Sequence, residues 1–462
     1  MKKITTIILL CLFYINSSFS QSNVSKSTGF DYPSVATEVY SPDSIKAELE
    51  NLIKQIRETH PNLLMIVDYE ELLRVKNEIL KQITAPMNQL DVFRLFSLLN
   101  PILSDGHNGI ELPERNKQVN EAIKLGDRLL PLSVHIDKDF RLFVKTSSNG
   151  IASGTRIHSI NGIDAIEITK HLEKHTRGDN SDMRRNWISQ TFAKKLWEQY
   201  GSSKSFVLGI KEGEEIKEIT INENIDLFSQ RSGNKSFEDK FSFELLADNQ
   251  VGYFKANTFY LPEGNKELYA LTDSMFSTLR DKGSKYLIID IRENGGGMTD
   301  LWIEGIFSHT AKKKWQSMSH FIGRVNETDE DFPGRIGEVA IYDFKDEHEV
   351  SNKPKFDGEI YVIVGRRTYS SAIQFASVIK DSQFGKIVGQ EARTYARGCS
   401  TGRFVNHEMK TSGLRAFTPE HWYQRNTGGS CMTGVEVDIQ LPDSPYNERE
   451  IVDSLVQQLT KE

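Results

Sequence analysis

Two adjacent serines stand where an apolar run changes into a helix-forming one in YVIVGRRTYSSAIQFASVIKD, residues 361–381. A serine at such a junction can cap the helix through its hydroxyl, or it can act as a nucleophile when a base accepts its proton. Ser371, with Gln374 three residues later, fits a capping box, which gives it a structural role. Ser370 has no local explanation of this kind and is therefore the nucleophile candidate.

A glycine-rich turn follows a second apolar run in KYLIIDIRENGGGMTDLW, residues 285–302. Ligand sites of α/β sheets lie at the carboxyl ends of strands, and glycines let the backbone come close to a ligand. Backbone N–H groups here suit a phosphate or the oxyanion of an acyl-transfer reaction. The phosphate-loop and dinucleotide patterns are absent, so a nucleotide site is poorly supported. A tight turn that binds nothing is the alternative.

One of the eleven histidines stands out as a base for the serine. His107 lies in LSDGHNGIEL, residues 103–112, between an apolar helical run and a short strand pattern. Imidazole is the side chain that most readily takes a proton from a hydroxyl near neutral pH. Taken alone, the position of His107 favours a histidine that simply occupies a turn over a catalytic one.

These segments together carry a family resemblance. YLIIDIRENGGG and IVGRRTYSSAIQFA resemble the C-terminal processing, or tail-specific, serine peptidases, a family that includes the tricorn core and the repeats of interphotoreceptor retinoid-binding protein. Thr368, Ser370, Ala372, Phe375 and Ala376 match the family's nucleophile motif. LSDGHNGI, GTRIHSING (like the second half of a PDZ domain) and TGVEVDIQL also match, so the resemblance covers nearly all of the chain after its first twenty residues.

The resemblance implies roles for individual residues. Ser370 would be the nucleophile, and the backbone N–H groups of Ser371 and of Gly296 or Gly297 would form the oxyanion hole. The lysine base of the processing branch is replaced by Arg397 in TYARG. Arginine keeps its proton at any working pH and cannot act as a general base.

The tricorn branch, which uses a histidine from the preceding domain, is therefore the better guide, and His107 lies where that histidine would fall. In that branch a glutamate comes just before the last strand. No acid immediately precedes Gly434, and Glu436 is the nearest candidate for a third member.

The hydrophobic patterns predict how the chain is divided. Helical spacing from about residue 40 to 104 is followed by short β segments up to about residue 221, and then by apolar strands that alternate with helices in a largely parallel, buried sheet. The resemblance implies an α/β core of the ClpP/crotonase-like type, built of ββα units. The predicted parts are a signal peptide (1–20), an N-terminal helical domain (21–125), a PDZ-like, mostly β domain (126–225), a linker (226–243) and the peptidase core (244–462).

The first twenty residues, MKKITTIILLCLFYINSSFS, predict a secretory signal peptide cut after Ser20. The apolar run is shorter than the ~20 residues of a spanning helix, so a membrane anchor is the weaker alternative. Cys11 lacks the small residues that precede a lipidated cysteine. The chain is thus expected in the periplasm or outside the cell, where Cys399 and Cys431 either pair or stay as buried thiols.

Charge and composition exclude some functions. Loss of Lys2 and Lys3 changes the formal charge from -7 to -9, and no basic stripe remains to attract nucleic acid. We expect no metal and no cofactor. The leading hypothesis is a serine endopeptidase that cleaves peptides or unstructured protein tails. The alternatives are an inactive relative that binds peptides or hydrophobic ligands, and an esterase that uses the same serine.

Overall fold

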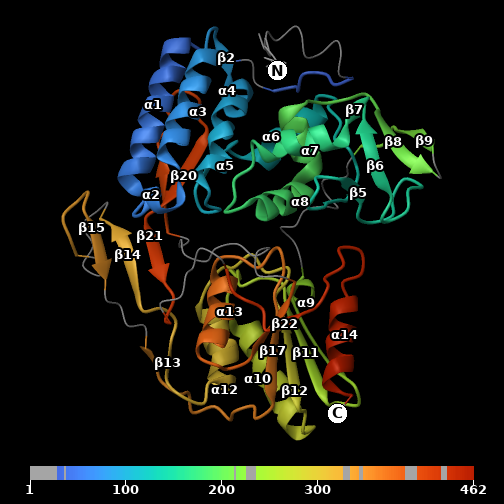
Figure 1. Cartoon of the computed structure of the whole chain (residues 1–462), viewed down its shortest axis with the longest axis vertical. Helices are drawn as coiled ribbons and strands as arrows, with labels where there is room; N and C mark the ends of the chain where they lie inside the picture. The colour runs from blue at the N-terminus through green and yellow to red at the C-terminus, as the bar shows by residue number, and fades with distance from the viewer. Residues whose placement is uncertain are drawn as a thin grey trace, which may run out of the picture.

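The computed structural model describes residues 29–35, 38–212, 215–224, 236–325, 333–342, 347–390, 403–427 and 434–461 of the chain. The predicted signal peptide, Arg397, Cys399 and Cys431 lie outside these residues, as does most of the predicted linker. Figure 1 shows a blue helical part and a green, sheet-containing part above a yellow and orange α/β core. In the part of the chain that is described, no helix combines the length and the apolar character needed to cross a membrane.

The N-terminal part is helical, as predicted. Ser41 begins the first long helix, because its hydroxyl accepts the N–H of Ser44 (3.2 Å). The apolar residues at helical spacing in this helix, Ile45, Leu49, Leu52, Ile53 and Ile56, are all buried. The helices are α1 (Pro42–Thr59), α2 (Leu63–Ile66), α3 (Tyr69–Gln82), α4 (Gln89–Phe96), the 3-10 turn Ser97–Leu99 and α5 (Asn100–Leu103), with a short pair of strands, β1 (Val39–Tyr40) and β2 (Met87–Asn88).

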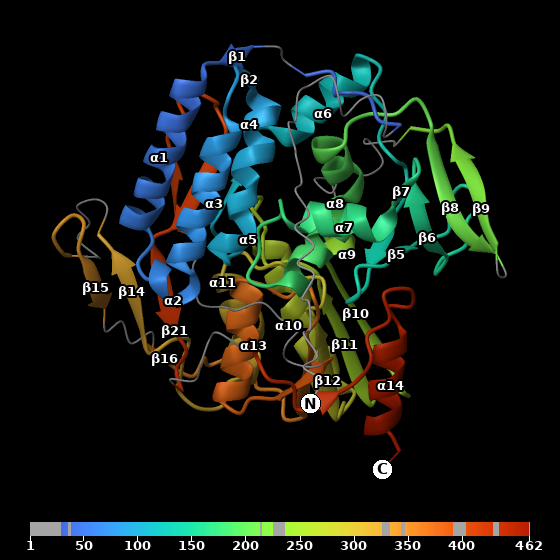
Figure 2. The same cartoon turned by 45° about the horizontal axis from the view of Figure 1, so that its top comes forward.

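Strands from near the C-terminus complete this helical part. β20 (Arg415–Pro419) pairs antiparallel with β3 (Gly109–Glu111) and with β19 (Phe404–His407). Leu414 and Ala416 join the core of the helices, and both views show β20 among them (Figures 1 and 2). The neighbouring sheet has β14 (His320–Arg324) between β15 (Val339–Tyr342) and β21 (His421–Gln424). The sequence pattern placed residues 404–424 wholly within the C-terminal core, and this return of the chain was not foreseen.

The second part contains the predicted short strands and one long helix that was not predicted. The strands are β4 (Val134–Ile136), β5 (Leu142–Val144), β6 (Arg156–Ile160), β7 (Ile163–Asp164), β8 (Phe206–Glu212) and β9 (Glu215–Ile221), with helices α6 (Arg115–Lys124) and α7 (Ala165–Glu173). The extra helix, α8 (Ser181–Gln199), has no clear apolar stripe because it is enclosed on several sides and buries charged residues such as Arg185, Lys195 and Glu198.

The core sheet is largely parallel and buried, as predicted. Its order is β10 (Phe241–Leu246), β11 (Val251–Ala256), β12 (Tyr286–Asp290), β17 (Glu359–Ile363), β18 (Lys386–Gly389) and β22 (Ile439–Gln440), and only the β10–β11 pair is antiparallel. α9 (Phe237–Lys240) and β10 begin inside the range predicted as a linker, because their alternating apolar residues pack on the sheet.

Helices cover both faces of this sheet. α10 (Lys266–Asp281) and α13 (Ser371–Asp381) pack on one face, together with α11 (Asp300–Trp302), a π-helical turn (Ile303–Phe307) and α12 (Ser308–Thr310). α14 (Glu450–Leu459) covers the other face. The remaining strands, β13 (Trp315–Gln316) and β16 (Glu347–His348), pair with each other. Because β12 and β17 are parallel neighbours, the glycine turn and the serine loop leave the same edge of the sheet side by side.

Candidate active site

Ser370 sits on a sharp turn between β17 and α13. Its backbone has φ 52° and ψ -126°, a region that residues with a side chain rarely occupy. Two hydrogen bonds hold the residues just before Ser370 against the segment that follows β12. The Thr368 hydroxyl donates to the carbonyl of Ile291 (2.8 Å), and the N–H of Tyr369 donates to the carbonyl of Asn294 (3.1 Å). A strained serine between a strand and a helix is the geometry that exposes a nucleophilic hydroxyl.

Ser371 does not form the capping box that the sequence suggested. It is the first residue of α13, and its hydroxyl accepts a hydrogen bond from the indole N–H of Trp302 (2.8 Å). Ser370 occupies the N-cap position instead, and its side chain makes no capping hydrogen bond. The capping interpretation was wrong because the turn with positive φ lies at Ser370, so the helix starts at Ser371, one residue earlier than the pattern implied.

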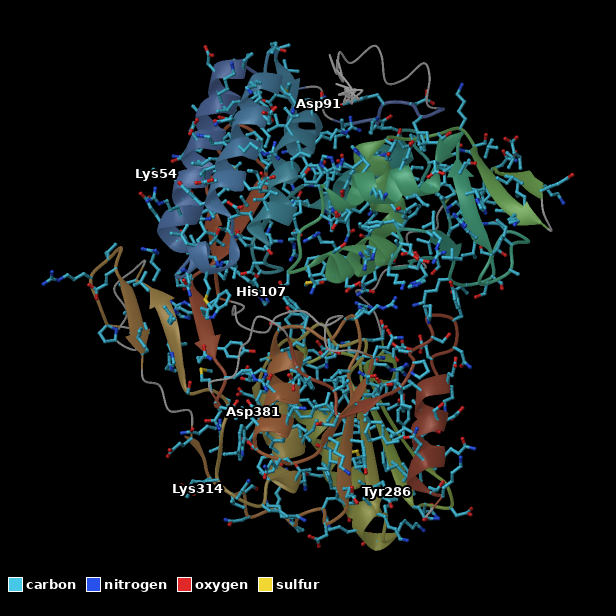
Figure 3. All side chains as sticks on the ribbon, in the orientation of Figure 1. Lys54, Asp91, His107, Tyr286, Lys314 and Asp381 are labelled. Carbon is cyan, nitrogen blue, oxygen red and sulfur yellow. The ribbon has the colours of Figure 1, made fainter. Side chains whose placement is uncertain are left out.

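His107 reaches Ser370 from the helical part of the chain. Its Nε2 lies 3.2 Å from the Oγ of Ser370, and Figure 3 places it at the boundary between the upper parts and the core. The N–H of His107 donates to the Asp105 carboxylate (2.7 Å), and the N–H of Gly106 donates to Asp179 (2.6 Å). The guanidinium of Arg177 holds the carbonyl of Gly106. This loop therefore orients the imidazole toward the serine.

The electrostatic surroundings keep His107 neutral. Burial lowers the pKa of His107 to about 4. The positive charge of Arg177 also lowers this pKa, whereas the negative charge of Asp105 raises it. Burial alone would raise the pKa of Asp105, but His60 and His107 beside that carboxylate lower it to about 2. A neutral imidazole beside a hydroxyl can accept its proton at neutral pH.

Tyr369 and Asp179 lie on the far side of the imidazole. The Tyr369 hydroxyl is 3.1 Å from Nδ1 of His107 and donates to the Asp179 carboxylate (3.1 Å). The Tyr369 ring stacks on the imidazole with centroids 4.7 Å apart. Because the hydroxyl has one proton and gives it to Asp179, Nδ1 carries its own proton and Nε2 presents a lone pair to Ser370. Sequence reasoning missed both residues. Tyr369 is next to the nucleophile, but Asp179 is in no motif.

The glycine turn packs directly against the nucleophile. Gly296 has φ +98°, and a Cβ added there would lie 2.7 Å from the Cβ of Ser370. The N–H of Gly296, one of the expected oxyanion donors, donates instead to the side chain of Asn294 (2.9 Å). Its carbonyl accepts the N–H of Phe259 (3.0 Å). In a trans peptide the next N–H, that of Gly297, points the opposite way.

The other two expected oxyanion donors remain available. Across the residues that the structure describes, the N–H groups of Gly297 and Ser371 have no hydrogen-bond acceptor. Two such groups beside a nucleophile can stabilise the negative oxygen of a tetrahedral intermediate.

Glu436 is placed away from this group. Its side chain is exposed, and its carbonyl accepts a hydrogen bond from Lys380 in the last turn of α13. Ser370 precedes the first turn of the same helix, and at 1.5 Å per residue these two ends are about 15 Å apart. Glu436 is therefore far from His107. In the described part of the chain, Asp179 and Asp105 are the carboxylates that lie beside the imidazole.

Comparison with known proteins agrees with the motifs. Residues 250–441 match the model of peptidase family S41. The tail-specific protease of Haemophilus influenzae (strain ATCC 51907 / DSM 11121 / KW20 / Rd) is 25% identical over 213 residues, which is 44% of this chain and 26% of that protein. The match thus spans about a quarter of the relative's length. The predicted resemblance to the tail-specific peptidases is confirmed, and residues 250–441 are of the serine-peptidase type.

Solved structures extend the likeness to the other parts of the chain. A crystal structure of a CPAF mutant has a TM-score of 0.67 and 13% identity, and covers 91% of this chain and 97% of its own. Mature CPAF has a TM-score of 0.63 at 13% identity, covering 90% and 96%. At such identities the likeness concerns the fold alone, which is of mixed α/β content.

Proposed function

We propose that this chain, whose residues 250–441 match the model of peptidase family S41, is an exported serine endopeptidase that cleaves peptides or unstructured protein tails. The observation that carries the proposal is the 3.2 Å approach of His107 Nε2 to Ser370 Oγ. These residues are 263 positions apart in the sequence, and the fold brings them together.

The mechanism follows from the geometry. Ser370 Oγ attacks the substrate carbonyl carbon while its proton passes to Nε2 of His107. The carbonyl oxygen becomes negative and is held by the N–H groups of Gly297 and Ser371. Collapse of the intermediate breaks the C–N bond, and the imidazolium returns the proton to the leaving amine. Water then attacks the acyl carbon while Nε2 of His107 takes a proton from it. The bond between the acyl carbon and Ser370 Oγ breaks, and the imidazolium returns the proton to Oγ.

Tyr369 and Asp179 would hold the catalytic tautomer. The positive charge that forms on the imidazole is balanced by the Asp179 carboxylate through the tyrosine hydroxyl. In this proposal these two residues replace the glutamate expected near the last strand. They support His107 and do not themselves touch the substrate.

We further propose a ClpP/crotonase-like core and a PDZ-like module for residues 126–225. A peptide that binds a PDZ domain adds a strand to a sheet edge. Here α8 covers the edge of β4, and the Ser189 hydroxyl accepts the N–H of Ile136 (3.0 Å). The module is therefore proposed to shape the cleft rather than to bind tails along β4. Export to the periplasm or the medium rests on the N-terminal sequence pattern alone.

A fluorophosphonate probe tests the activity, because such a probe reacts with an activated serine only. We expect labelling that is lost in Ser370→Ala and retained in the neighbouring control Ser371→Ala. Hydrolysis of a casein-derived fluorogenic peptide should follow the same order. No labelling of the folded wild-type protein would favour a binding protein without turnover.

A further inference from the structure

His60 ends helix α1, and its side chain is buried next to the proposed active site. Its N–H donates to the carbonyl of Ile56 (2.9 Å), and its own carbonyl accepts a hydrogen bond from Arg324 of β14 (3.3 Å). Its ring meets that of Trp422 in β21 edge to face, with the centroids 6.1 Å apart. α1, β14 and β21 thus hold the imidazole in one orientation.

The contacts of this imidazole determine where its proton lies. Nδ1 accepts the N–H of Asn62 (3.0 Å), so the ring proton is on Nε2. Nε2 lies 3.6 Å from Oδ2 of Asp105, and it makes no hydrogen bond to another group among the residues that the structure describes. An N–H group that faces a carboxylate in the protein interior stabilises the negative charge, because the effective dielectric constant there is low.

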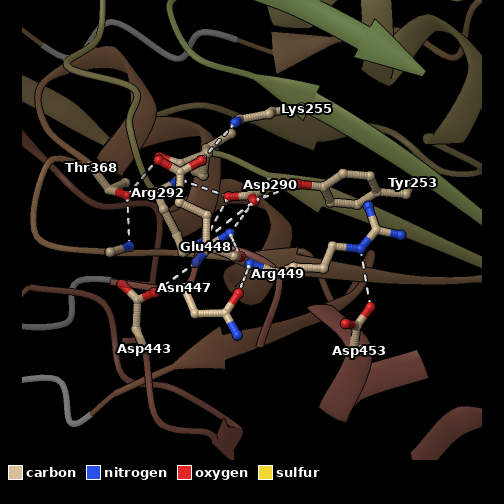
Figure 4. A network of polar contacts seen from close by, with 12 residues as sticks. Tyr253, Lys255, Asp290, Arg292, Thr368, Asp443, Asn447, Glu448, Arg449 and Asp453 are labelled. Carbon is tan, nitrogen blue, oxygen red and sulfur yellow. Dashed lines mark hydrogen bonds and ion pairs between the residues drawn. The ribbon is translucent and has the colours of Figure 1, made fainter. Parts of the chain in front are cut away.

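Asp105 lies between the imidazoles of His60 and His107. Its Oδ1 accepts the backbone N–H of His107 (2.7 Å) and is 4.0 Å from Nδ1 of that ring. Burial raises the pKa of Asp105, but the contact with His60 is the largest of the effects that lower it to about 2. By contrast, the buried carboxylate of Asp290 is neutralised by the guanidinium of Arg292 (2.7 Å), as Figure 4 shows. Asp105 is thus an ionised carboxylate within reach of two imidazole rings.

We propose that His60 is a positioning residue of the active site, which keeps Asp105 ionised and turned toward the imidazole of His107. The inference rests on the proposed function, in which His107 is the base for Ser370. It adds a second histidine to the site, and this histidine comes from the end of α1 rather than from the loop that carries His107.

The charge of Asp105 matters at the moment of proton transfer. When Nε2 of His107 takes the proton of Ser370, the imidazole becomes a cation, and the carboxylate 4.0 Å from its Nδ1 stabilises this cation. Asp179 reaches the same nitrogen through a tyrosine hydroxyl, so two carboxylates share this task. His60 touches neither the substrate nor the reacting atoms, and its effect passes through Asp105.

Two substitutions separate the N–H of His60 from the bulk of its ring. His60→Leu fills the space without a donor, whereas His60→Gln keeps an N–H at the end of the side chain. We expect His60→Leu to lower kcat and the rate of fluorophosphonate labelling about tenfold with KM unchanged, and His60→Gln to stay within about threefold of the wild type. The end-point of labelling counts the folded sites, so a lower rate at the same end-point reports the reactivity of Ser370.

His309→Leu is the matched control. It removes another buried imidazole whose Nε2 contacts an aspartate, Asp273 of α10 (2.7 Å), and whose ring stacks on Phe276. This variant should lose stability but keep the labelling rate of the wild type. An unchanged labelling rate in His60→Leu, or equal losses in His60→Leu and His60→Gln, would overturn the proposal.

A measurement without the leucine variant covers the case in which that variant does not fold. Nitrogen NMR of Ser370→Ala protein labelled with [15N]histidine reports which ring nitrogen of His60 carries the proton, and the signal is assigned by its loss in His60→Gln. We expect the proton on Nε2, and a proton on Nδ1 alone would refute the role of His60. Absence of labelling in the folded wild-type protein would instead contradict the proposed function, and this inference with it.

Discussion

Replacement of Gly296 by alanine probes the contact on which the proposed active site depends. The new Cβ would lie 2.7 Å from the Cβ of Ser370, 2.8 Å from the carbonyl oxygen of Tyr369 and 2.9 Å from the N of Ser371. Real Cβ atoms do not come so close to backbone, so the serine turn must move. The φ of +98° adds strain for any residue with a side chain.

The magnitude follows from these two terms. A left-handed backbone costs an L-residue about 1–2 kcal/mol, and forced overpacking costs about 1–3 kcal/mol. We therefore expect Gly296→Ala to lower the free energy of unfolding by about 2–5 kcal/mol. A shift of the nucleophile by about 1 Å should lower kcat/KM about 100-fold.

Gly295→Ala is the matched control. A Cβ at Gly295 meets nothing within 4 Å, and its φ is not in the left-handed range. Its free energy of unfolding should stay within about 0.5 kcal/mol of the wild type. Urea denaturation measures the change in the free energy of unfolding, and the rate of fluorophosphonate labelling measures the reactivity of Ser370. If Gly296→Ala unfolds at the same urea concentration as Gly295→Ala and is labelled as fast, the packing argument is wrong.

Three further predictions concern the residues around Ser370. Tyr369→Phe keeps the ring stacked on His107 but removes the hydroxyl that contacts Nδ1 and Asp179. We expect kcat/KM to fall about tenfold with KM unchanged. An unchanged kcat would contradict this role of the tyrosine. The base must be unprotonated, and burial lowers the pKa of His107 from 6.5 to about 4, so kcat/KM should fall only as the pH drops through about 4. A fall of kcat/KM already near pH 6.5 in the pH–rate profile would refute the lowered pKa of His107. Because the unfolded chain takes up this proton first, stability should also decrease between pH 6.5 and 4. Ser371→Ala removes the acceptor of the Trp302 indole and should cost about 1 kcal/mol of stability, yet it keeps the oxyanion N–H and most of the hydrolysis.

Local sequence patterns predicted the structural features that depend on residues adjacent in the chain. The apolar spacing of α1 and α3, the buried parallel strands and the change from strand to helix around Ser370 were all visible in the sequence. The proximity of His107 to Ser370 was inferred only through the family resemblance, because no local pattern encodes a contact across 263 positions.

What was missed depends on tertiary context. α8 has apolar and charged residues on all sides because it is enclosed, so its periodicity is weak. Asp179 comes just before this helix, and only the fold brings it to Tyr369. The assignment of a cap to Ser371 failed because the backbone at Ser370 has a conformation that the residue type does not predict.

The pairing of β20 with β3 has a consequence for the integrity of the molecule. Strand β3 from the first part of the chain and strands β19 and β20 from near its end meet in a single three-stranded sheet, and Leu414 and Ala416 fill the hydrophobic interior of the first helices. Cleavage of a peptide bond between β9 and α9 would therefore leave two fragments that have no covalent link. They would stay associated through the β3–β20 pairing and the shared hydrophobic core. His107 and Ser370 would then belong to different polypeptides of one nicked protein, and two separately expressed halves should reassemble into a working enzyme.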